Sequence, residues 1–159
     1  MNRRNLNLGS AALLVAAVAL PAAHAGATSR NGVIKAKSAY SMAETIERIK
    51  QDVAAKGIKL FDVIDQAKLA KDAGVTLNPS TLIVFGNPPL GTQFLTAKPE
   101  SGLDWPVRLL VFQDDSGQVW TAYTDFSWIA KRHGITNRGP QFKMASEVIA
   151  SITSSVTAR

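Results

Sequence analysis

Apolar and polar residues alternate in a way that predicts a short strand followed by a long helix. Residues 32–37 alternate weakly, as a strand does. From Ser41 onward, apolar residues recur at intervals of three and four, which places them on one face of a helix. Ser41 and Glu44 fit a capping box, in which Glu44 reaches back to the Ser41 backbone N–H, and Gly57 is the expected end. The predicted stripe is Met42, Ile46, Ile49 and Val53.

Four further strands are predicted, each bounded by turn residues. Asp114-Asp115-Ser116-Gly117 is typical of a hairpin turn, so the last two strands are expected to be antiparallel. Helical turns are expected over 67–73, and a short helix or irregular segment follows Gly86 and ends at Ala97. The strands are predicted over 58–64, 81–85, 106–112 and 118–124.

Two helices are predicted after the last strand. Asp125 is expected to cap the first, which ends at His133 before Gly134. Together the elements predict one α+β domain at residues 26–159, with a mostly antiparallel sheet and helices on one face. The buried face of the final helix is predicted to be Phe142, Ala145, Ile149, Ile152 and Val156.

The predicted strands are apolar on both sides, although a sheet with one face in water alternates more cleanly. In the second strand, Leu60 and Ile64 point to one side, and Phe61 and Val63 to the other. Something is therefore expected to cover the second sheet face. The candidates are residues 87–97, a second copy of the chain, or a ligand, and we accordingly expect a homodimer or a ligand pocket.

The first 25 residues have the layout of a secretory signal peptide. Arg3 and Arg4 precede an apolar run at 8–20, and Ala23-His24-Ala25 is a small-x-small cleavage site. The run is shorter than the roughly 20 residues that span a bilayer, so cleavage is favoured over a membrane anchor. The paired arginines leave twin-arginine export as an alternative, although Asn7 stands where an apolar residue is usual. A periplasmic or secreted protein without a membrane span is expected.

Composition removes several classes of chemistry. The chain has no cysteine, which excludes a thiol nucleophile, disulfides and an iron–sulfur cluster. Of its two histidines, His24 belongs to the predicted signal peptide, which leaves His133. Because a standard zinc site needs three or four His or Cys ligands, no metal or other cofactor is predicted. The net charge of +6 comes without a basic run, so nucleic acid is not an expected partner.

Candidate binding residues occur at two places in the chain. Gly86 and Asn87 lie where a strand meets a helix, and the simpler interpretation is a turn in which Gly86 adopts an unusual φ and Asn87 caps the helix. The alternative is an anionic or polar ligand held at that helix start, with Thr92 nearby. Arg108 is a charge within an apolar strand, and it requires a carboxylate partner, for example Asp62 or Asp125, or an anionic ligand.

A catalytic interpretation would place Arg108, Tyr123, Asp125 and His133 around one cleft, yet nothing in their spacing requires it. His133 is more simply one of three cations that favour a helix C-terminus. There is also no Gly-x-Ser-x-Gly nucleophile motif. The sequence therefore favours a non-enzymatic module that binds a small ligand or another protein. A small enzyme and a haem or ligand carrier remain the alternatives.

Several segments together resemble the domain of unknown function 302 family, over about residues 34–134. The resemblance implies a TATA-box-binding-protein-like α+β fold with the order βαββββα, and no established activity. Many family members have a histidine where this chain has Gln66, so a metal or haem role for that position is not expected here. The matching segments are 41–57, Ile64-Asp65-Gln66-Ala67, 81–88, Gly91-Thr92, Gly102-Leu103-Asp104, 107–114 and 130–134.

Overall fold

The structure is a computed structural model that describes residues 31–157. The predicted signal peptide and its cleavage site lie outside the described residues. Among the helices that are described, none is both long and apolar enough to cross a membrane.

The strands form a single five-stranded sheet with the order β1-β5-β4-β3-β2, and every neighbouring pair is antiparallel. The hairpin between β4 and β5 turns through Gly117, whose φ is +83°. All five predicted strands are therefore confirmed within a residue or two. They are β1 (Val33–Lys37), β2 (Lys59–Asp65), β3 (Ser80–Gly86), β4 (Val107–Gln113) and β5 (Val119–Thr124).

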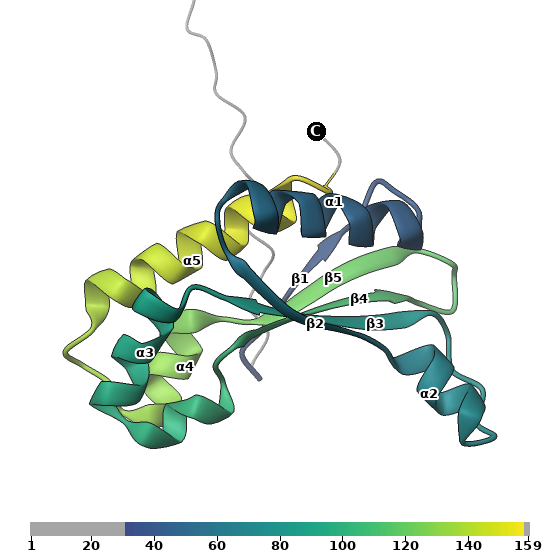
Figure 1. Cartoon of the computed structure of the whole chain (residues 1–159). Helices are drawn as coiled ribbons and strands as arrows, with labels where there is room; N and C mark the ends of the chain where they lie inside the picture. The colour runs from purple at the N-terminus through teal and green to yellow at the C-terminus, as the bar shows by residue number, and fades with distance from the viewer. Residues whose placement is uncertain (1–30, 158–159) are drawn as a thin grey trace, which may run out of the picture.

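The helices lie on one face and at the ends of this sheet, as Figure 1 shows, so the α+β expectation is confirmed. The two longest, α1 and α5, cover the same face, and α3 and α4 pack at one end of it beneath α5. The helices are α1 (Met42–Ala55), α2 (Gln66–Asp72), α3 (Pro88–Ala97), the 3₁₀ helix η1 (Pro99–Leu103), α4 (Phe126–His133) and α5 (Gly139–Ser154).

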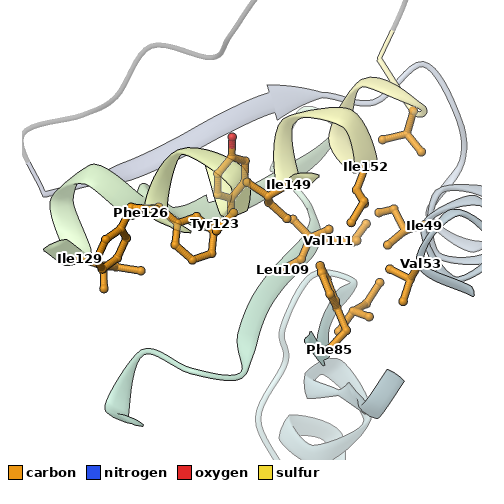
Figure 2. Packing of buried hydrophobic residues seen from close by; sticks show 14 of the residues in the cluster. Ile49, Val53, Phe85, Leu109, Val111, Tyr123, Phe126, Ile129, Ile149 and Ile152 are labelled. Atoms are coloured by element: carbon orange, nitrogen blue, oxygen red, sulfur yellow. The ribbon is translucent and has the colours of Figure 1, made fainter. Parts of the chain in front are cut away.

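The hydrophobic core fills the space between the sheet and its covering helices (Figure 2). The sheet contributes alternate residues such as Ile83 and Leu109, and both are fully buried. An aromatic group extends the core toward α3 and α4, where the Phe94 and Phe142 rings stack with centroids 4.2 Å apart. The predicted faces of α1 and α5 pack in or against this core, and Val156, which was predicted to belong to the final helix, is buried just beyond the end of α5.

In the part of the chain that the structure describes, the opposite face of the sheet carries no helix across its centre, and α2 meets it only at one end, where Gln66 bonds to Ser80. Residues 87–97, one of the three candidates for covering it, do not do so, because α3 packs on α5 and places Phe94 in the main core. The register between the strands aligns one side chain from each strand in a row across this face. Leu82 and Leu110, near the middle of this row, are half-buried. The row runs Ile64, Leu82, Leu110, Ala122 and Lys35.

The start of α1 confirms one half of the predicted capping box. The Ser41 hydroxyl accepts a hydrogen bond from the Glu44 backbone N–H at 3.3 Å. The other half is wrong, because the Glu44 carboxylate accepts from Arg48 one turn later, at 2.9 and 3.0 Å. Arg48 also stacks on the Tyr40 ring, 3.9 Å from its centroid, so a second contact favours the observed arrangement.

Candidate functional site

A cavity of about 370 Å³ opens between α5, α3 and the adjoining ends of β3 and β4. Its inner wall is aromatic, and Phe85, Phe94 and Phe126 are each at most 5 % exposed. The rim carries the polar side chains, including Lys56 and Glu147. The remaining lining residues are Ile58, Gly86, Asn87, Leu90, Gly91, Trp105, Val107, Met144, Ala145, Val148, Ile149 and Ser151.

Two glycines make room for the indole of Trp105 on the cavity wall. A Cβ at Gly91 would lie 1.8 Å from Trp105 Nε1, and one at Gly86 would lie 3.2 Å from the same atom. Gly86 does not adopt a positive φ, so the conformational role predicted for it is wrong. Its importance lies in having no side chain where the indole passes. On its other side the indole meets Phe61 edge-on, with centroids 6.1 Å apart.

The start of α3 is already satisfied by its own residues. The Asn87 side chain accepts from the Leu90 N–H at 3.3 Å, and the Gly91 N–H donates to the Asn87 carbonyl. Pro88 and Pro89, which occupy the first helical positions, have no N–H to offer. Thr92 is exposed and donates to the Pro88 carbonyl at 2.8 Å. Gly86 and Asn87 thus line the cavity, whereas Thr92 and Arg108 do not.

A second group of polar residues gathers around Asp104, whose side chain is only 4 % exposed. His133 Nε2 lies 2.6 Å from one carboxylate oxygen, and Arg132 lies 3.2 Å away. Arg108 contributes a longer contact of 3.4 Å and also donates to the Leu103 carbonyl. The expected ion pair of Arg108 therefore exists, but its partner is Asp104 rather than Asp62 or Asp125.

The four weak catalytic candidates do not meet around one cleft. Asp125 accepts from the Ser127 N–H at the start of α4, whereas His133 stands at its other end, about 12 Å along an eight-residue helix. Tyr123 lies on the helix-covered face of the sheet, and Arg108 lies on the opposite face. Burial raises the pKa of the Tyr123 hydroxyl, and the Asp125 carboxylate adds to this rise while a hydrogen bond from Thr153 opposes it.

Comparisons with known proteins assign the chain to a family. The model of the family described as "Domain of unknown function DUF302" matches residues 34–158. The chain belongs to this family. A crystal structure of an uncharacterized conserved DUF302 protein from Bacillus stearothermophilus superimposes with a TM-score of 0.72 at 15 % identity. The match covers 79 % of this chain and 98 % of that one, which confirms the fold.

Curated relatives of this DUF302 protein carry a different name. The chain is 38 % identical over 127 residues to "Fluoride-specific ion channel FluC 1" of Brucella suis biovar 1, and equally so to the protein of that name from Brucella abortus. The match covers 80 % of this chain but 49 % and 46 % of those proteins. The chain therefore spans about half the length of the curated relatives that it matches, and the channel activity is a statement about them.

The histidine that many DUF302 proteins carry is replaced here by Gln66, which has a structural role. Its side-chain oxygen accepts a hydrogen bond from the Ser80 hydroxyl at 2.8 Å, joining α2 to β3. Within residues 31–157, no group of three or more His, Cys, Asp or Glu side chains is arranged to hold a metal ion.

Sequence reasoning missed three residues that define the two sites of this DUF302 domain. Asp104 and Gly91 were noted only as parts of the family resemblance, and Trp105 was not singled out from the sequence. A useful signal was available, because Gly86 and Gly91 flank the start of one helix at a spacing of five. Two glycines this close together suggest a close approach by a bulky group, but they do not identify Trp105 as that group.

Proposed function

We propose that this DUF302 protein is a non-enzymatic module that binds a small, largely apolar ligand in the cavity beside Trp105. The carrying observation is the cavity itself, which has an aromatic inner wall and polar side chains at its rim. Its volume of about 370 Å³ falls within the range of 300–1,000 Å³ that is usual for small-molecule sites. His133 and Arg108 meet only at the Asp104 carboxylate, and Asp125 and Tyr123 lie apart from that pair, which favours binding over catalysis.

Titration with naphthalene, followed by tryptophan fluorescence and calorimetry, tests this proposal. We expect saturable binding of one naphthalene per chain. Val148→Phe places a ring in the cavity and is expected to weaken binding at least tenfold. Ala150→Phe adds the same ring to an exposed position on α5 outside the cavity, and it is expected to leave binding unchanged. Equal affinity in the two variants, or no saturable binding to the natural protein, would contradict the proposal.

We further propose that the uncovered sheet face joins two copies of the chain. Five strands at a spacing of about 4.8 Å and about 20 Å long give a face of about 400 Å² in outline. Side chains that stand out from the sheet add to this outline, which by itself is about half of the roughly 800 Å² per partner of a stable interface. The half-buried residues Leu82, Val84, Leu110 and Phe112 supply an apolar centre for such an interface.

Charges at the two edges of this face support pairing with a second copy. Lys35 and Lys37 lie at the β1 edge, and Asp62 lies at the β2 edge. A two-fold axis parallel to β4, between two facing sheets, places β1 of one copy over β2 of the other. Lys35 of one copy then lies one residue row from Asp62 of the other, on both sides of the interface. Native mass spectrometry of the purified protein is expected to give the mass of a dimer.

Export remains part of the proposal, with residues 1–25 as the signal peptide. A protein recovered from the periplasm or medium of an expressing bacterium is expected to begin at Gly26. Its intact mass tests this directly, and a full-length mass in the cytoplasmic fraction would contradict it.

A further inference from the structure

We infer that the ligand of this cavity is an uncharged, mostly apolar molecule with a hydrogen-bond acceptor that binds the indole N–H of Trp105. The inference rests on the proposed function, because it assigns a chemical class to the occupant of the same cavity. Three observations support it. They are the size of the cavity, the pairing of the charges at its rim, and the lack of a hydrogen-bond acceptor for the Trp105 N–H among the described residues.

The size of the cavity limits the ligand to a compact molecule. A water molecule occupies about 30 Å³ in the liquid, so about 370 Å³ accommodates about a dozen groups of that size. Two fused aromatic rings with one substituent, or an acyl chain of about ten carbons, meet this limit. The aromatic inner wall formed by Phe85, Phe94 and Phe126 favours rings, because aromatic pairs gain beyond the area that they bury.

The charges at the rim are matched within the protein. Lys56 Nζ lies 2.6 Å from Asp52 Oδ1, and Glu147 lies 3.9 Å from Lys143. Lys56 and Glu147 line the cavity mouth, but each has an opposite charge on its own helix. The deeper wall is apolar, and a charged group there would lose hydration without a partner. A neutral ligand therefore fits better than a carboxylate or an ammonium.

The Trp105 N–H is a donor without an acceptor. Among the described residues, no oxygen or nitrogen atom accepts a hydrogen bond from this N–H. The Nε1 atom is also not among the fully buried side-chain atoms that lack a partner, so it is accessible from outside the protein interior. Nε1 is the ring atom nearest to the place that a Cβ would take at either Gly86 or Gly91, and all three residues line the cavity. A donor at an apolar wall gains most from a ligand that brings an acceptor.

Asn87 offers a second hydrogen-bond donor at the rim of the cavity. Its side-chain oxygen is used by the α3 cap, where it accepts from Leu90, so the group that remains to meet a ligand is its NH₂. The donors of Trp105 and Asn87 on this side of the cavity favour a carbonyl or ether oxygen on the ligand.

Two matched probes test the inference by calorimetry on the full mature chain. 1-Acetylnaphthalene carries a carbonyl oxygen, and 1-ethylnaphthalene has nearly the same shape without an acceptor. We expect the ketone to bind about fivefold more tightly, which is the usual value of one added hydrogen bond. The charged 1-naphthoate is expected to bind at least tenfold more weakly than the ketone. Equal affinities of the two neutral probes would overturn the assigned acceptor while leaving the cavity as a binding site.

Trp105→Phe removes the N–H but keeps an aromatic ring, so the preference for the ketone is expected to disappear. Trp120→Phe is the control, because that indole lies on the opposite sheet face and donates to Asp114 Oδ2 at 2.7 Å. Indole N–H resonances of the natural protein provide a measurement that needs no variant. Only the Trp105 signal is expected to move downfield with the ketone, and no selective shift would contradict the inference. If neither neutral probe binds, the proposed function itself fails.

Discussion

Trp105 illustrates what a single residue can require of positions far from it in the chain. The indole needs two places without a side chain, and they are provided by the last residue of β3 and the first turn of α3. From the sequence, Gly86 and Asn87 could be assigned to a strand-to-helix junction, and Asn87 is indeed the cap of α3. The sequence could not show that Trp105 passes over Gly86, because nothing in the local pattern records a contact across 19 positions.

Asp104 is expected to be the residue whose charge matters most for stability outside the core. Asp104→Asn leaves His133, Arg132 and Arg108 without their common carboxylate, which is nearly inaccessible to solvent. Because both arginines are about half exposed, water compensates part of the loss, and we expect about 2 kcal/mol of destabilisation. Arg132→Ala is the comparison, with an expected loss below about 1 kcal/mol. Urea unfolding at pH 7 measures both, and equal losses would contradict the central role of Asp104.

Asp114 is expected to make stability depend on pH at the acidic end. Hydrogen bonds from Ser116 and Trp120 lower the pKa of its carboxyl from 3.8 to about 2. A folded-state pKa below the unfolded value stabilises the fold fully above about pH 4, and this contribution is lost as the pH falls toward 2. Asp114→Asn is therefore expected to flatten the dependence of stability on pH between 4 and 2. Urea midpoints across this range test it, and parallel curves for the two proteins would refute it.

Elements were the most predictable scale, because periodicity and caps are local properties. All five strands and the long helices agree with the sequence pattern, and Asp125, Ser41 and Asn87 cap the helices that they were expected to cap. The position of α3 was not predictable in the same way. Residues 87–97 have an apolar side, but only packing against Phe142 decides which face of the sheet receives them.

The start of α1 allows the two halves of the predicted capping box to be compared. Ser41→Ala removes the side-chain cap and is expected to cost about 1 kcal/mol. Glu44→Ala removes only an exposed pair with Arg48 and is expected to cost about 0.3–0.5 kcal/mol. Thermal unfolding of the two variants at low and high salt checks this. The Glu44→Ala effect should fall with salt, and a larger loss for Glu44→Ala than for Ser41→Ala would contradict the observed arrangement.

For the whole molecule, the central question is what meets the uncovered sheet face. Leu110→Glu places a charge at the centre of that face and is expected to convert the proposed dimer into a monomer. Met144→Glu, an equally severe change on α5 over the opposite face, is expected to leave the dimer intact. Native mass spectrometry distinguishes the outcomes. A dimer that survives Leu110→Glu with unchanged dissociation would place the interface elsewhere.

Charge reversal provides a check that does not disturb the apolar centre. Lys35→Glu and Asp62→Lys are each expected to weaken the dimer about threefold to tenfold, and the double variant is expected to recover most of the loss. Recovery requires β1 of one copy to face β2 of the other, so losses that simply add would rule out this arrangement.

The place of β1 in the sheet has a consequence for how the chain acquires its fold. This strand pairs only with β5, and Val33 meets Thr124 across about ninety intervening residues. Contacts of such long separation form slowly, because a large loop must close before they contribute. The sheet therefore stays incomplete until its fifth strand has been synthesised. The export proposed above would benefit from this delay, since the earlier strands cannot assemble the finished domain while the rest of the chain is still to come.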